Sequence, residues 1–154
     1  MVIYYSWGGN TKRYAEELAA KKGIACFALV EKNNRRHGPF GFIKSGFQSA
    51  FKKETEVISL PDLSGLDELY LCSPIWASGM APALRYCIKH AGLSGKKINF
   101  LFTCASAPDM GAIKSMAVAA LDGAGCEIGE TYAFVPPKKG EDADATVGAH
   151  IDTV

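Results

Sequence analysis

Short apolar runs alternate along this chain with segments whose apolar residues recur at helical spacing. The apolar runs predict five strands, at residues 1–5, 24–30, 66–72, 97–103 and 127–135. Helical spacing predicts the intervening helices, at residues 12–22, 42–53, 80–91 and 113–124. Strands that alternate with helices form a parallel sheet with right-handed crossovers. The sequence therefore predicts one α/β domain over residues 1–154, doubly wound, with helices on both faces of the sheet.

Three of these segments carry more specific expectations. Residues 24–30 form a continuous apolar run, which predicts a buried strand. Residues 127–135 alternate between apolar and polar, which is typical of a less buried edge strand. Residues 138–154 have a poor helical pattern, so we expect at most a weak last helix there.

Composition limits the possible partners and the compartment. The formal net charge of +1 gives no overall field that would attract nucleic acid, and no apolar stretch is long enough for a membrane span. The five cysteines show neither a C-x-x-C pair nor metal-ligand spacing, and the start of the chain does not resemble a signal peptide. These features predict a cytoplasmic protein whose thiols are reduced and mostly buried.

The turn between the first strand and the first helix carries the strongest functional signal. It contains three hydrogen-bonding side chains, Ser6, Asn10 and Thr11, together with Gly8 and Gly9. Glycines let the backbone approach a ligand, and a helix start directs unpaired N–H groups and partial positive charge into the same space. The turn is therefore a candidate phosphate site. The alternative is a tight turn in which Asn10 or Thr11 caps the helix.

Two further loops are expected at the same edge of the sheet, because both follow predicted strands. Residues 73–79 form a loop that offers the indole of Trp76, and residues 103–109 form a loop of small residues. Ligands of such sheets bind outside the carboxyl ends of the strands. A flat aromatic ring that carries a phosphate would suit all three loops. Trp76 is expected to cover that ring, and its removal is expected to change the stability of the ligand-free protein little.

Residues 40–53 combine four phenylalanines with lysines and glycines. The first interpretation is the helix at 42–53 that covers the sheet. The second is an aromatic surface for a partner or for a second copy of the chain.

Three motifs together resemble the flavodoxin family, and more closely its small NAD(P)H-reductase-like branch. They are Ser6-Trp7-Gly8-Gly9-Asn10-Thr11, Pro74-Ile75-Trp76-Ala77 and Thr103-Cys104-Ala105-Ser106. The resemblance implies a five-stranded parallel sheet of order 2-1-3-4-5 that binds FMN. It assigns cofactor contacts to Ser6, Trp7, Gly8, Gly9, Asn10, Thr11, Pro74, Ile75, Trp76, Ala77, Gly79, Thr103, Cys104, Ala105 and Ser106.

The resemblance also implies a role. It predicts an FMN-binding redox protein that carries electrons between redox partner proteins or small-molecule donors and acceptors, with a homodimer as a further option. Two alternatives stay open: an NAD(P)H-dependent FMN or quinone reductase, and a flavin-free binding module. A P-loop nucleotidase is excluded because the G-x-x-x-x-G-K-[ST] motif is absent. A receiver domain is excluded because Tyr5-Ser6 and Cys72-Ser73 stand where acidic residues are needed.

Overall fold

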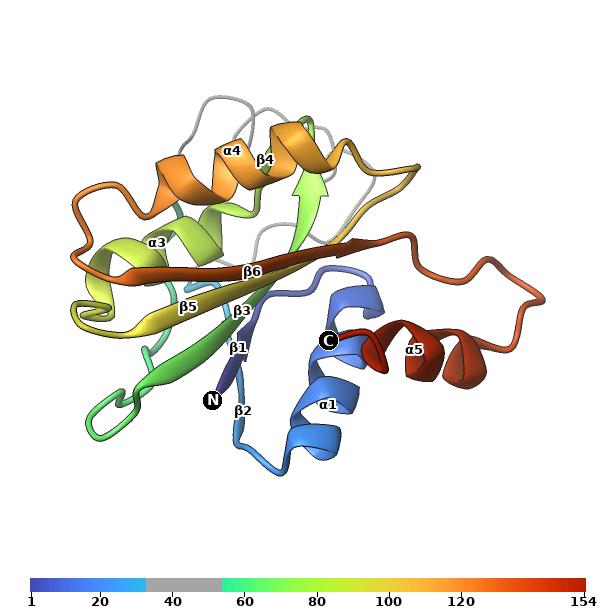
Figure 1. The fold of residues 1–154 in the computed structure, drawn as a ribbon, viewed down its shortest axis with the longest axis horizontal. Helices are drawn as coiled ribbons and strands as arrows, with labels where there is room; N and C mark the ends of the chain where they lie inside the picture. Colours follow the sequence, from blue (N-terminus) through green and yellow to red (C-terminus); the bar gives the residue numbers. More distant parts are fainter. Residues whose placement is uncertain (33–53) are drawn as a thin grey trace.

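A computed structural model describes residues 1–32 and 54–154 (Figure 1). Five parallel strands form the sheet in the order β2-β1-β3-β5-β6. Their bounds are β1 Val2–Tyr4, β2 Cys26–Ala28, β3 Glu68–Trp76, β5 Lys97–Thr103 and β6 Glu127–Phe134. A two-residue strand, β4 (Gly79–Met80), pairs antiparallel with the end of β3. The predicted order 2-1-3-4-5 is confirmed, because β5 and β6 are the fourth and fifth strands of the predicted series.

Helices cover both faces of this sheet, as predicted. Figure 1 shows α1 and α5 on one face and α3 and α4 on the other. Their bounds are α1 Asn10–Lys22, α3 Pro82–His90, α4 Met110–Ala120 and α5 Ala143–Ile151. Within residues 1–32 and 54–154, no helix combines the length and apolar character that a membrane crossing requires. The predicted helix at 42–53 and the aromatic surface at 40–53 lie outside the described residues.

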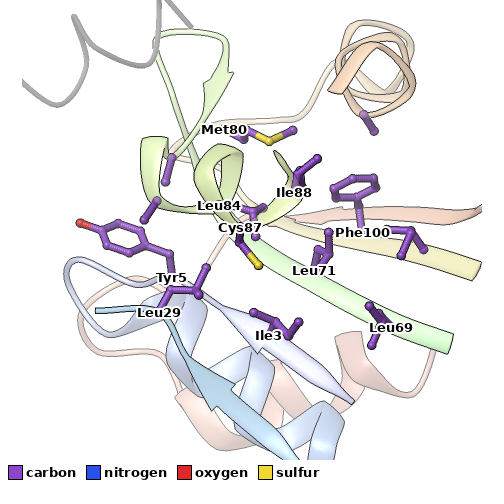
Figure 2. Packing of buried hydrophobic residues seen from close by; sticks show 14 of the residues in the cluster. Ile3, Tyr5, Leu29, Leu69, Leu71, Met80, Leu84, Cys87, Ile88 and Phe100 are labelled. Carbon is purple, nitrogen blue, oxygen red and sulfur yellow. The ribbon is translucent and has the colours of Figure 1, made fainter. Parts of the chain in front are cut away.

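The core has two layers because successive side chains of a strand point to opposite faces of the sheet. In β3, Leu69 and Leu71 pack in the layer under α3 and α4, whereas Tyr70 and Cys72 pack in the layer under α1 and α5. Figure 2 shows the first layer, with Leu84 of α3 beside Leu71. Each face of β3 is therefore closed by a different pair of helices, which fixes the register of the central strand.

Of the predictions for the two edge strands, one is wrong and the other is confirmed. The predicted buried strand at 24–30 is wrong: β2 is only three residues long, and Cys26 and Ala28 are exposed. The physical reason is its place at the edge, where β1 is its only neighbour in the sheet among residues 1–32 and 54–154. The predicted edge position of residues 127–135 is confirmed, because β6 ends the sheet on the other side and its residues are exposed or half-buried.

A β-bulge interrupts the pairing of β5 with β6. Ile98 pairs with Ile128, but Phe100 pairs with Thr131, so two residues of β6 oppose Asn99. The Asn99 side chain is 97% buried and compensates for the break. Its Oδ1 accepts the Glu130 N–H at 2.9 Å, and its Nδ2 donates to Glu68 Oε1 at 2.9 Å. Asn99 therefore links β6 to β3 through the strand between them.

The last helix is better defined than its sequence pattern suggests. The Asp142 carboxylate caps α5 by accepting the N–H groups of Asp144 and Ala145. Val147 and Ile151 are buried in the layer that α5 shares with α1. Packing against α1 thus stabilises a helix whose own amphipathic pattern is weak.

Candidate functional site

A hydrogen bond from the backbone to a side chain closes the turn between β1 and α1. The Ser6 Oγ accepts the Gly9 N–H at 3.1 Å. Gly9 is the N-cap of α1 with φ of 90°, a left-handed conformation that glycine adopts without steric cost. The alternative that Asn10 or Thr11 caps the helix is wrong, because no side chain caps α1 and both residues lie in its first turn. Because no side chain caps α1, the N–H groups of Asn10 and Thr11 in its first turn have no intrahelical partner.

Thr11 joins this turn to the end of β5. Its Oγ1 lies 2.8 Å from Oγ1 of Thr103, and both residues are buried. The two residues are 92 positions apart in the sequence, yet they bring the first and third predicted loops into direct contact. This hydroxyl pair holds α1 over β5 and defines one wall of the site.

Replacing Thr11 with valine tests whether the hydroxyl pair of Thr11 and Thr103 stabilises the protein. The shape of the side chain is kept, but the buried Thr103 hydroxyl loses its partner. The free energy of unfolding of the ligand-free protein should fall by about 1–2 kcal/mol. Thr103→Val should cost a similar amount, and the double variant should lose clearly less than the two losses combined, as measured by urea unfolding. Strictly additive losses would show that the two hydroxyls act independently.

The second predicted loop is a β-hairpin, so the expectation of a loop at 73–79 is wrong. Strand β3 continues to Trp76, and the chain turns through Ala77 and Ser78 into β4. Both turn residues have positive φ, 46° and 62°. A two-residue hairpin turn requires this conformation, because its twist matches that of the strands. Residues other than glycine adopt it at a cost, so the turn holds local strain beside the site.

Trp76 stands at the end of β3 within a cluster of aromatic rings. Its ring meets that of Tyr5 edge-on at 5.8 Å and that of Trp7 edge-on at 5.9 Å between centroids. Tyr5 is buried, Trp76 is half-buried, and Trp7 is 37% exposed. The indole of Trp76 therefore packs against the core on one side and reaches the site on the other.

The third predicted loop follows β5 and is fixed at both ends. The Cys104 N–H donates to the Phe134 carbonyl at 2.9 Å, and Asp109 caps α4 by accepting the Ala112 N–H at 3.1 Å. Burial raises the pKa of the Cys104 thiol, which keeps it protonated and a poor nucleophile at neutral pH. All five cysteines are free, and three of them, Cys72, Cys87 and Cys104, are buried.

These three segments enclose one cavity of about 610 Å³ at the carboxyl edge of the sheet. Twelve of the fifteen residues assigned from the sequence line it, namely Ser6, Trp7, Gly8, Asn10, Thr11, Pro74, Ile75, Trp76, Ala77, Thr103, Cys104 and Ala105. The other three are placed differently. Gly9 is the N-cap of α1, Gly79 lies in β4, and Ser106 lines an adjoining cavity of about 320 Å³.

One wall of the cavity is not among the residues predicted from the sequence. It consists of the four residues that follow β6, which are Val135, Pro136, Pro137 and Lys138. The signal was available, because β6 is parallel to its neighbours and its carboxyl end must reach the same edge.

Comparison with solved structures agrees with this architecture. A flavoprotein in complex with FMN from Lactobacillus acidophilus is 19% identical, with a TM-score of 0.70 over 97% of this chain and 95% of that one. Flavodoxin 2 from Bacillus cereus is 16% identical, with a TM-score of 0.54 over 98% and 94%. An NADH:FMN oxidoreductase is 15% identical, with a TM-score of 0.57 over 99% and 86%. The chain matches no protein-family model and no curated protein sequence.

The fold and the position of the cavity define a doubly wound α/β protein with a cavity at the carboxyl edge of its strands. Within that class, the strand order and the structural neighbours establish a flavodoxin-like fold.

Proposed function

We propose that this protein binds one FMN non-covalently in the 610 Å³ cavity and carries electrons between redox partners. One observation supports this proposal above the others. A helix start with available N–H groups, an indole and a loop of small residues all line the same cavity. The likeness to a flavoprotein in complex with FMN adds to it.

The residues around the cavity fit this cofactor. Its volume lies within the roughly 300–1,000 Å³ of typical cofactor sites, and its lining is mainly apolar with a few polar groups. Ser6, Asn10 and the N–H groups of Gly8, Asn10 and Thr11 would hold the phosphate, because the Gly9 N–H already donates to Ser6 Oγ. Trp76 would cover the isoalloxazine ring, and Ala105 would leave it room. When bound, FMN supplies the redox chemistry, while the protein binds and orients it.

The proposed role is a carrier, which the likeness to flavodoxin 2 from Bacillus cereus supports. Its partners would be redox proteins or small-molecule donors and acceptors. The five free thiols suit a reducing compartment, which supports a cytoplasmic location. A flavin reductase that uses NADH directly is the second candidate, favoured by the likeness to an NADH:FMN oxidoreductase.

A two-stage experiment tests binding and role together. The protein is first titrated with FMN, and we expect flavin fluorescence to be quenched with a stoichiometry of one per chain. The loaded protein is then mixed with NADH or NADPH without oxygen. A carrier should keep its yellow absorbance and lose it only with a chemical reductant. Bleaching by NADH or NADPH would favour the reductase, and absence of quenching would leave a flavin-free binding module.

A further inference from the structure

Lys138 is the only residue with a charged side chain among the described residues that line the cavity. It is exposed, and it follows the Pro136-Pro137 pair at the end of β6. The remaining lining residues are apolar, small or neutral polar. A single cation in an otherwise uncharged cavity points to an anionic group of the ligand.

Residues on both sides of Lys138 in the chain contact α1. Just before it, Phe134 stacks on Tyr14 of α1 at 5.6 Å between ring centroids. Just after it, Asp144 lies 4.0 Å from the Nε of Arg13. The chain before and after Lys138 therefore meets the start of α1, and between β6 and α5 it loops outward from the sheet (Figure 1). Lys138 lines the same cavity as Ser6, Gly8, Asn10 and Thr11 of the turn that begins α1.

The main chain at Lys138 is held in place, and its side chain is available. Its N–H donates to the Glu141 Oε2 at 2.8 Å, and its carbonyl accepts the Glu141 N–H at 3.1 Å. The two preceding prolines restrict the backbone further. Its ammonium forms no ion pair with any carboxylate in residues 1–32 and 54–154. By contrast, Lys12 pairs with Glu16 at 3.7 Å and lines a different groove.

We propose that the Lys138 ammonium binds the phosphate of the flavin and sets the preference for FMN over riboflavin. This inference rests on the proposed function. A helix start offers only about half a positive charge, which leaves much of the phosphate charge uncompensated. The Thr11 and Thr103 hydroxyls are bonded to each other, so only one of their two protons is left to donate to a ligand. Lysine binds phosphate as a point charge and needs no bidentate geometry.

Lys138→Gln tests the proposal, with Lys139→Gln as a matched control of equal charge. Each protein is titrated with FMN and with riboflavin at low ionic strength. For Lys138→Gln, the dissociation constant of FMN should rise about fivefold, as expected for one exposed ion pair, while that of riboflavin stays within about twofold. Lys139→Gln should match the wild type, and Lys138→Arg should retain the FMN preference. Added salt should shrink the difference.

The possible contrary results are distinct. Equal weakening of FMN and riboflavin by Lys138→Gln would make the residue part of the wall only, which overturns the inference. So would an unchanged FMN affinity, or an equal effect of Lys139→Gln. Each of these results would still show that the wild-type protein binds FMN, so the proposed function would stand. A wild-type protein that binds neither flavin would instead overturn the proposed function and this inference with it.

Discussion

Trp76→Ala will weaken the binding of FMN and also destabilise the ligand-free protein. Loss of the indole removes apolar contact and stacking, so FMN affinity should fall by roughly 1–3 kcal/mol. The sequence suggested an exposed side chain with little influence on stability. The structure changes that expectation, because the ring is half-buried and meets the buried Tyr5 edge-on. The free energy of unfolding should therefore fall by about 1–3 kcal/mol, below the range for a fully buried tryptophan.

Trp7→Ala provides the comparison for this result. Trp7 lines the same cavity and meets the same indole, but it is 37% exposed. Its loss should weaken FMN binding while lowering the free energy of unfolding less than half as much as Trp76→Ala. Urea unfolding of the flavin-free proteins and flavin titration measure the two effects separately. If Trp76→Ala left the free energy of unfolding unchanged, the ring contacts of Trp76 with Tyr5 and Trp7 would not stabilise the fold.

Gly129→Ala should produce the largest loss of stability. A Cβ at this position would overlap the Oδ1 of Asn99 and lie 3.2 Å from the Ile98 carbonyl oxygen. Asn99 cannot move away without breaking its hydrogen bonds to Glu130 and Glu68. Overpacking together with the loss of a buried hydrogen bond should cost about 2–5 kcal/mol of the free energy of unfolding. Urea unfolding at fixed pH measures it.

Gly148→Ala is the control for this substitution. Gly148 lies within α5, and an added Cβ there would have no atom within 4 Å. Alanine is the better helix former, so the free energy of unfolding should rise by about 0.5–1 kcal/mol. The same chemical change should thus have opposite effects in the bulge and in the helix. A loss below 1 kcal/mol for Gly129→Ala would mean that the β-bulge rearranges easily.

The sequence predicted the order of the elements well because each strand and helix carries its own periodicity. It failed where packing between distant segments decides the outcome. The residues of β2 are as apolar as those of a buried strand, and only the sheet order shows that β2 lies at an edge. The helix α5 has only two large apolar residues, Val147 and Ile151, and its order depends on packing against α1. The hairpin after β3 lacks the Asn-Gly signature of such turns, because Ala77 and Ser78 occupy the two strained positions.

Most residues that line the cavity could be found from the sequence, because three loops at one sheet edge carry recognisable motifs. Two features carry no such motif. The contact between Thr11 and Thr103 spans 92 positions and leaves no local pattern. The wall that contains Lys138 has no motif of its own, and only the parallel direction of β6 brings it to the cavity.

The place of β1 inside the sheet has a consequence for the order of folding. Val2 pairs with Tyr70 of β3 on one side and with Cys26 of β2 on the other. Strand β1 therefore gains both of its neighbours only after β3 has been synthesised. Thr11 meets its partner later still, when residue 103 is in place. Non-local pairing of this kind slows folding and postpones the assembly of the cavity to its late steps. A growing chain should therefore acquire flavin affinity only when nearly all of it has left the ribosome.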